Sequence, residues 1–199
     1  MLKRSALVYL LLALSLSLNC EPLYADPAIA STQVMTEEEK AEWLWIDTLN
    51  HRVLLMHQNK PFKIFEGASF GSGGIGRKHG RGDKITPRGF YKIGWMNEHS
   101  KYRHFYGLTY PSINDANLAI IQKKISMKEY QAIVDAHQAG KVPPQDTALG
   151  GQVGIHGLGS KPLSIHQSVN WTFGCIALTN KQIDELAKNI KLGTFVFIG

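Results

Sequence analysis

A cysteine and a histidine carry the chemistry that this sequence suggests. Cys175 follows Gly174, and His156, 19 positions earlier, precedes Gly157. A thiolate is a strong nucleophile, and an imidazole within hydrogen-bond reach can take the thiol proton and later return it. Gly174 leaves room for a substrate carbonyl to approach the backbone N–H groups near Cys175, where an oxyanion would be held. These residues predict a cysteine acyl-transfer site. The alternative is a buried structural cysteine near a hydrogen-bonded histidine.

Short elements must position the two pairs. Apolar runs at 153–155 and 176–178 are typical of strands. Thr179 and Gln182 have capping-box spacing, so a helix is expected from there to about Ile190. The nucleophile would therefore lie between a short strand and a helix start. Four residues separate Cys175 from the cap, so the helix dipole would lower the thiol pKa only weakly.

The first 25 residues have the pattern of a signal peptide. Lys3 and Arg4 form a basic region, 6–18 an apolar region, and Ala25 ends a cleavage site. The apolar run is short for a membrane span, and no later stretch reaches 18 apolar residues, so the mature chain is expected to be exported without a transmembrane segment.

The two cysteines have different fates in this interpretation. Cys20 would be removed with the signal peptide, although lipid anchoring at Cys20 is a minor alternative that Asn19 and Leu18 disfavour. Cys175 would then be the one cysteine of the mature chain, without a partner for an intramolecular disulfide. A lone thiol in an exported protein indicates a reactive residue or an intermolecular bridge.

Composition and charge restrict the function further. The 199 residues are 44% hydrophobic and include 19 glycines, as in a turn-rich globular protein. The net charge is +6, and loss of Lys3, Arg4 and Glu21 leaves +5. Such a charge suits an acidic polymer, and export argues against nucleic acid as partner. A cell-wall polymer that bears carboxylates fits better.

The remaining pattern predicts mainly β structure with a few helices, an α+β class. A leader with a short helix is expected at 26–42 and one catalytic domain at 43–199. Strands are predicted at 43–47, 52–57, 62–70, 90–95, 105–110 and 194–198, and helices at 114–121 and 126–139. The two helices precede the His-Gly pair, so they form either a lid over the site or a plain surface pair.

Two other kinds of site are disfavoured. Residues 71–76 match G-x-G-x-x-G, but a glycine-broken basic loop follows them where a dinucleotide site needs a helix. No H-x-x-x-H, C-x-x-C or H-E-x-x-H spacing occurs, so no metal and no cofactor is predicted. A zinc peptidase that uses His156, His166 and Cys175 is the weaker alternative.

Several motifs occur in the order found in one family. They are His156-Gly157, then T-F-G-C-I-A at 172–177, with G-D-x-x-T-P-x-G at 82–89, Y-G-L-T-Y-P at 106–111 and N-D-A at 114–116 upstream. On these motifs, 43–198 resembles the YkuD-type L,D-transpeptidase catalytic domain. Trp171-Thr172 before the cysteine and Thr179-Asn180 after it are similar to an exported, periplasmic proteobacterial branch with the motif W-T-x-G-C-I-A-x-T-N.

The resemblance implies a β-sandwich-like fold with a helical insertion before the catalytic motif. It implies that Cys175 attacks a peptidoglycan tetrapeptide stem after the L-centre of diaminopimelate, with D-alanine leaving and a thioester remaining. An amine acceptor, from a second stem or a wall-attached protein, would give transpeptidation, and water would give carboxypeptidase activity. His156 would act as base and then acid, oriented by the Gly157 carbonyl, with the N–H groups of Gly174 and Cys175 as oxyanion hole.

Substrate-binding residues are expected near this centre: Trp171, Thr172, Phe173, His166, Arg81 and Thr86. Arg81, with His79, would bind stem carboxylates, or the loop is simply solvated. The sequence departs from the family motif at Phe173, where many members have His, and at Ala177, where many have Arg or Asn. These changes leave the acceptor and the exact bond open. A non-catalytic wall-binding module remains the contrasting class.

Overall fold

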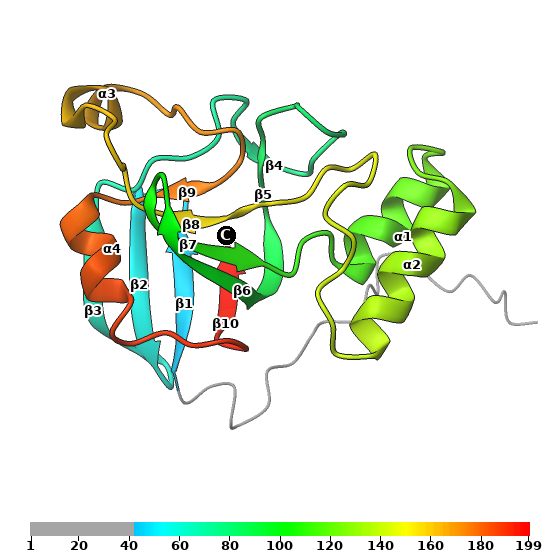
Figure 1. Ribbon diagram of the computed structural model, residues 1–199, viewed down its shortest axis with the longest axis horizontal. Coiled ribbons are helices and arrows are strands. Elements are labelled where there is room, and N and C mark those ends of the chain that lie inside the picture. The colour runs from blue at the N-terminus through cyan, green and yellow to red at the C-terminus, as the bar shows by residue number, and fades with distance from the viewer. Residues whose placement is uncertain (1–41) are drawn as a thin grey trace, which may run out of the picture. The chain divides into compact units, whose positions relative to one another are not determined.

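The computed structural model describes residues 42–199, which form mainly β structure with a few helices, as predicted (Figure 1). Its strands are β1 (Glu42–Asp47), β2 (Arg52–His57), β3 (Lys60–Glu66), β4 (Ile75–Gly76), β5 (Thr86–Pro87), β6 (Gly89–Ser100), β7 (Arg103–Leu108), β8 (Gly154–His156), β9 (Ile176–Ala177) and β10 (Phe195–Ile198). Its helices are α1 (Ile113–Ile121), α2 (Met127–Gln138), α3 (Leu163–Ser168) and α4 (Asn180–Leu186). The predicted signal peptide, Cys20 and nearly all of the predicted leader lie outside the described residues.

Eight strands form one sheet in the order β3-β2-β1-β10-β6-β7-β8-β9, and β4 and β5 form a separate pair. The long strand β6 pairs with β10 through its first half and with β7 beyond it, with register shifts between Ile93 and Trp95. Such irregularities bend a strand. Ser69, which follows β3, bridges Ala177 of β9 at the other end of the order. The sheet thus folds back on itself, which gives the sandwich-like arrangement.

Alternating side chains fill the space that this folded sheet encloses. Leu44 and Ile46 of β1 are fully buried, as are Ile155 of β8 and Ile176 of β9. Ile183 of α4 packs in the same core. Burial of each such side chain contributes roughly 1.5–3 kcal/mol relative to exposure. The core therefore fixes the two short strands that precede Gly157 and follow Cys175.

Helices α1 and α2 lie side by side beyond one end of the sheet strands (Figure 1). Both begin with a capping box, at Ser112 and Ser126, and the predicted start of α2 is confirmed. Gly140 follows α2 with φ +65°, the left-handed conformation that ends many helices. The insertion between β7 and β8 is therefore a defined helical pair.

Some predicted boundaries were wrong. The strand expected at 62–70 is β3, which ends at Glu66 because Gly67 turns the chain with φ +77°. β6 continues to Ser100, beyond the strand expected at 90–95, because its end pairs with β7 in a hairpin. The last helix ends at Leu186 instead of near Ile190. The short helix α3 was not predicted.

Candidate active site

The register of β8 and β9 places the predicted nucleophile and base on one face of the sheet. The strands are parallel, with Ile155 opposite Ile176 and His156 opposite Ala177. Paired residues share a face and successive residues alternate, so the two isoleucines face the core and His156 faces the other side. Continued one residue back from β9, this alternation puts Cys175 on the same side as His156. A disposition on opposite faces, which would have excluded the dyad, is not observed.

His156 is arranged as a neutral base. It is only 2% exposed, and its Nδ1 donates a hydrogen bond to the Gly157 carbonyl at 2.7 Å. A carbonyl can only accept, so the proton is on Nδ1 and Nε2 keeps its lone pair. Burial lowers the pKa of His156 to about 4, although the bond to Gly157 opposes this effect. The imidazole is therefore unprotonated at neutral pH.

Aromatic rings hold this imidazole in place. The Tyr102 ring, at the β6–β7 turn, stacks on it at 4.5 Å between centroids, and Phe105 of β7 lies nearly parallel at 5.8 Å. Trp171 meets it edge-on at 5.8 Å. Phe105 is also the residue directly opposite His156 in the β7–β8 pairing. These neighbours restrict the ring to one orientation.

Cys175 is a free, protonated thiol in this environment. Its Sγ donates a weak hydrogen bond to the carbonyl of Gln152 at 3.5 Å. Burial raises the pKa of the Cys175 thiol to about 11, against the opposing effects of the Gly154 N–H and the Lys78 charge. The resting pair is thus a neutral thiol and a neutral imidazole. The thiol proton must move as the sulfur attacks, since no ion pair is formed in advance.

The turn before Cys175 requires glycine. Gly174 has φ +120°, and a Cβ there would lie 2.7 Å from the Ile85 carbonyl oxygen. Its N–H donates to Thr172 Oγ1 at 3.2 Å, and the same hydroxyl donates to the Cys175 carbonyl at 2.7 Å. The Gly174 N–H is therefore engaged within the turn. The Cys175 N–H is left as the better backbone donor for the predicted oxyanion hole.

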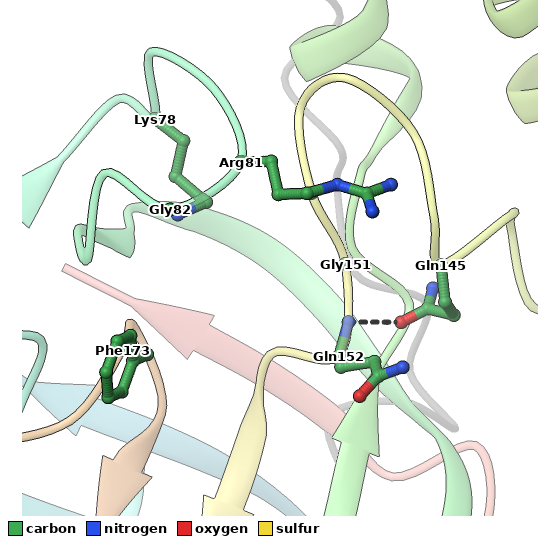
Figure 2. Close-up of a pocket in the computed structure, with 8 residues that line it drawn as sticks. Lys78, Arg81, Gly82, Gln145, Gly151, Gln152 and Phe173 are labelled. Atoms are coloured by element: carbon green, nitrogen blue, oxygen red, sulfur yellow. Dashed lines mark hydrogen bonds between the residues drawn. The ribbon is translucent and has the colours of Figure 1, made fainter.

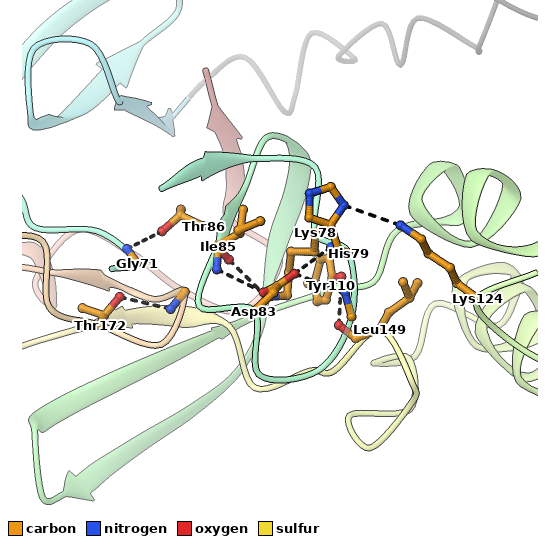
Figure 3. A network of polar contacts seen from close by, with 12 residues as sticks. Gly71, Lys78, His79, Asp83, Ile85, Thr86, Tyr110, Lys124, Leu149 and Thr172 are labelled. Atoms are coloured by element: carbon orange, nitrogen blue, oxygen red, sulfur yellow. Dashed lines mark hydrogen bonds and ion pairs between the residues drawn. The ribbon is translucent and has the colours of Figure 1, made fainter. Parts of the chain in front are cut away.

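Two predicted substrate-binding residues are buried. Thr86 is fully buried, and its Oγ1 accepts the Gly71 N–H at 2.8 Å. Thr172 is 2% exposed, and its hydroxyl closes the turn around Gly174. Figure 3 shows both contacts within one polar network. Burial and these bonds engage both hydroxyls within the protein, and substrate contact by Thr86 and Thr172 stays a prediction.

A pocket of about 300 Å³ lies between the 78–82 loop, the 145–152 loop and Phe173 (Figure 2). It is lined by Lys78, Arg81, Gly82, Gln145, Gly150, Gly151, Gln152 and Phe173. Gln152 connects it to Cys175, because its carbonyl accepts the thiol hydrogen bond. Arg81 is anchored by two bonds from its guanidinium to the Thr147 carbonyl, at 3.0 and 3.2 Å. The pocket thus combines cationic and amide groups with one aromatic side.

Phe173 forms that aromatic side. It is 74% exposed, although it is separated from Cys175 only by Gly174. Lys84 Nζ lies 5.2 Å from the centre of its ring, a cation–π contact. Of the predicted substrate-binding residues, Arg81 and Phe173 are the two that line the pocket.

His166 and Trp171 act together on the other side of the base. The indole N–H of Trp171 donates to His166 Nδ1 at 3.4 Å. His166 is 5% exposed, and burial lowers its pKa. The sequence allowed His166 a substrate-side role or none, and this stays a prediction; its buried ring contacts Trp171, which in turn contacts His156.

The helical insertion supports the pocket from outside. Glu129 of α2 accepts the Ala148 N–H at 2.8 Å, which anchors the loop that carries Gln145 and Gln152. The lining residues come from that loop, the 78–82 loop and Phe173, so α1 and α2 contribute none of them. The lid function of the two helices stays a prediction.

Several residues of the site were not predicted from the sequence. Lys78, Gln145 and Gln152 line the pocket, and Tyr102 and Phe105 hold the base. A signal for Phe105 existed, since an aromatic residue in a strand before the His-Gly strand is a natural cross-strand partner. The glutamines and Lys78 lie in loops and had no such signal.

Within residues 42–199 no three His, Cys, Asp or Glu side chains are grouped so that they could hold a metal ion. His156, His166 and Cys175, weighed above as zinc ligands, do not form such a group. None of the helices in the same residues has the length and apolar character that a membrane crossing needs.

Two solved structures have a similar fold at low sequence identity. The helical cell shape determining protein Pgp2 from Campylobacter jejuni has 23% identity and a TM-score of 0.51, covering 79% of this chain and 47% of that chain. Bd1075 from Bdellovibrio bacteriovorus has 20% identity and a TM-score of 0.52, with coverage of 82% and 49%. This chain therefore spans about half the length of those structures, and the likeness concerns the fold.

An L,D-transpeptidase from Xylanimonas cellulosilytica is also similar, with 17% identity, a TM-score of 0.44 and coverage of 80% of this chain and 60% of that chain. No curated protein matches the chain. The family model of the YkuD L,D-transpeptidase catalytic domain matches residues 41–198, which include every element described above. The chain belongs to the YkuD family of L,D-transpeptidase catalytic domains.

Proposed function

We propose that this protein is a peptidoglycan L,D-transpeptidase that works through a thioester on Cys175. The observation that carries the proposal is the β8–β9 register, which puts Cys175 and His156 on one face. The Nδ1 bond to Gly157 supports it, because Nε2 is left free to accept a proton. Family membership supports peptidoglycan stem peptides as the substrate class.

The proposed reaction begins with proton transfer from Cys175 Sγ to His156 Nε2 as the sulfur attacks the carbonyl after the L-centre of diaminopimelate. A C–S bond forms, and the negative charge moves to the carbonyl oxygen. The C–N bond to D-alanine then breaks, and His156 gives its proton to the departing amine. The product of this first half of the reaction is a thioester on Cys175. An acceptor amine attacks the thioester, its proton passes through His156 to the thiol, and the C–S bond breaks.

The pocket would bind part of the donor stem. Arg81 supplies positive charge for a carboxylate, the glutamines supply amides, and Phe173 supplies an apolar face. The neutral state of both His156 and the Cys175 thiol favours a mechanism in which charge appears only during attack. Substrate binding therefore has to provide the remaining stabilisation of the anion.

Hydrolysis of the same stems is the second candidate. Its supporting observation is the exposed aromatic ring of Phe173, which stands where the family motif commonly has His. Ala177, where the motif commonly has Arg or Asn, is fully buried and presents no charged group to an acceptor. Water in place of the amine would give carboxypeptidase activity. A non-catalytic wall-binding role is the outcome if neither product forms.

We further propose that the protein is exported and acts in the periplasm, on the basis of the signal-like residues 1–25 and the wall substrate. Lipid anchoring at Cys20 is the minor alternative. The name of Pgp2, a helical cell shape determining protein, supports a proposed role in cell-wall biogenesis and cell shape.

The test uses purified protein with disaccharide-tetrapeptide, with and without a second stem or another amine, and mass spectrometry of the products. Cys175→Ala is expected to fold and to lose all turnover, and His156→Ala to lose at least 100-fold, roughly the contribution of a positioned base. Wild-type protein should yield cross-linked product with the amine, whereas the hydrolytic candidate yields only the shortened stem.

The outcomes separate the candidates. Full turnover by Cys175→Ala would exclude the nucleophile. If product forms under single-turnover conditions and no thioester adduct on Cys175 is seen at any time, the acyl-enzyme is excluded. Circular dichroism of each variant controls for folding.

A further inference from the structure

Lys78 is buried beside the segment that carries the nucleophile. Its side chain is 4% exposed, whereas lysine is rarely buried unless it is paired. Its ammonium forms an ion pair with Asp83 and donates to the Ile85 carbonyl at 3.2 Å. Figure 3 shows Lys78, Asp83 and Ile85 in one cluster of contacts. The position of this charge is therefore fixed.

The fixed charge lies against Gly174. A Cβ built on Gly174 would be 3.7 Å from Lys78 Nζ and 2.7 Å from the Ile85 oxygen that Lys78 binds. Cys175 is the next residue, and the Lys78 charge acts to lower its pKa against the effect of burial. Lys78 also lines the pocket with Phe173. The ammonium thus lies next to the residue that precedes Cys175 and beside the pocket.

Asp83 does not fully cancel this charge. Its carboxylate accepts the N–H groups of Ile85 at 3.0 Å, His79 at 2.6 Å and Gly80 at 3.2 Å, in addition to Lys78. Burial opposes ionisation, but these bonds lower the pKa of Asp83, so it stays charged at neutral pH. Of the two charges in the pair, it is Lys78 that acts on the pKa of Cys175, and it acts to lower it.

Stability alone is a weak reason to keep such a pair. Replacement of a buried ion pair by apolar residues of similar volume is often neutral or stabilising. The resting thiol and imidazole are both neutral, so a developing anion at the site needs a cation in place before attack. Lys78 meets that need without movement.

Building on the proposed function, we propose that Lys78 is a positioning residue for Cys175, whose ammonium, held by Asp83 and Ile85, stabilises the negative charge that forms during attack. The charge moves from the sulfur to the carbonyl oxygen of the donor as the C–S bond forms, while the proton goes to His156. The ammonium keeps its proton throughout.

Other charged or titratable groups surround the thiol and this pair. They are His156 from β8, His166 beyond it, Arg81 in the pocket, Lys84 on Phe173, and Tyr110, whose pKa is raised by burial and by the nearby Asp115 and Asp83. His156, the proposed base, has a pKa of about 4, whereas the pKa of Cys175 is about 11. The two titrations are therefore well separated in pH.

The test is the pH dependence of Cys175 alkylation by iodoacetamide in the full chain, followed on the peptide that contains Cys175 so that Cys20 does not interfere. Lys78→Met is expected to raise the apparent thiol pKa by at least one pH unit, because a unit charge within about 12 Å has at least that effect at an effective dielectric constant of about 20. Alkylation at neutral pH should slow by at least about tenfold. The value of kcat should fall with it.

Two further variants test the direction in which charge near Cys175 shifts the thiol pKa. Lys78→Arg keeps the charge and should restore most of the wild-type pH profile. Asp83→Asn removes the opposing charge and should lower the apparent thiol pKa. A purely structural role predicts the reverse for Lys78→Met, because loosening the loop exposes the thiol and lowers its raised pKa.

The outcomes of this test can be told apart from those of the test of the proposed function. An unchanged or lowered thiol pKa in Lys78→Met, or a shift in the same direction in Lys78→Met and Asp83→Asn, overturns the role of Lys78 even if Cys175→Ala is inactive. Turnover by Cys175→Ala overturns the proposed function, whatever the alkylation profile shows.

Discussion

At the scale of single residues, Gly174 is constrained both by its backbone and by its surroundings. Its φ of +120° is strained for other residues, and a Cβ would lie 2.7 Å from the Ile85 oxygen. Gly174→Ala is therefore expected to lower the free energy of unfolding by about 1–3 kcal/mol and to abolish most activity, because Ile85 and the adjacent Lys78 must shift. Denaturant unfolding and stem turnover measure the two effects.

Gly193 offers the matched control. It also has a positive φ, +84°, but nothing lies within 4 Å of a Cβ there. Gly193→Ala should cost about 1 kcal/mol from backbone strain and leave turnover unchanged. Equal losses of activity in the two variants would show that Gly174 matters only through general stability.

Residue identity and residue environment were predictable to different degrees. Cys175 and His156 stand out because each adjoins glycine next to a short apolar run, and the bond from His156 to Gly157 was expected from the family motif. Lys78 could not be identified as a neighbour of Gly174, because that contact joins loops 96 positions apart in the sequence. The burial of Thr86 is likewise a property of the folded chain.

At the scale of elements, helix starts were predicted well where a side chain caps them. Ser126 and Thr179 form capping boxes that the sequence displays directly. The helix α3 was missed because its N-cap, Pro162, makes no side-chain cap bond and the helix has six residues. The β8–β9 register was beyond prediction, since two short apolar strands can pair in several ways and the enclosed core selects one.

Glu129 connects α2 to the pocket loop, and this connection can be tested. One carboxylate oxygen caps Ser126, and the other accepts the Ala148 N–H at 2.8 Å. Glu129→Ala is expected to raise KM several-fold, because the loop with Gln145 and Gln152 loses its anchor. The helix cap, worth about 1 kcal/mol, is lost as well. Steady-state kinetics and thermal unfolding separate the two effects.

Ser126→Ala is the control for this prediction. It removes the cap hydroxyl but keeps the Glu129 bond to Ala148, so KM should remain at the wild-type value while stability falls. Glu129→Gln retains an acceptor oxygen and should recover part of the affinity. If Ser126→Ala raises KM as much as Glu129→Ala, the effect comes from helix stability and the loop anchor is irrelevant.

At the scale of the whole molecule, the buried site links stability to pH. Burial lowers the pKa of His156 from 6.5 to about 4, so between these values the unfolded chain binds a proton that the folded chain does not. The stabilising contribution is thus complete above pH 6.5 and decreases as pH falls towards 4. The full difference is about 3 kcal/mol, and the lowered pKa of His166 acts in the same direction.

Denaturant unfolding of wild-type protein at a series of pH values from 7 to 4 should therefore show a free energy of unfolding that declines with acidity. His156→Gln removes the titrating group and should flatten this decline, whatever its own stability at pH 7. NMR titration of the His156 ring gives its folded pKa independently. Parallel curves for the two proteins would mean that the folded pKa of His156 equals its unfolded value of 6.5. In that case burial would not be what keeps the imidazole neutral.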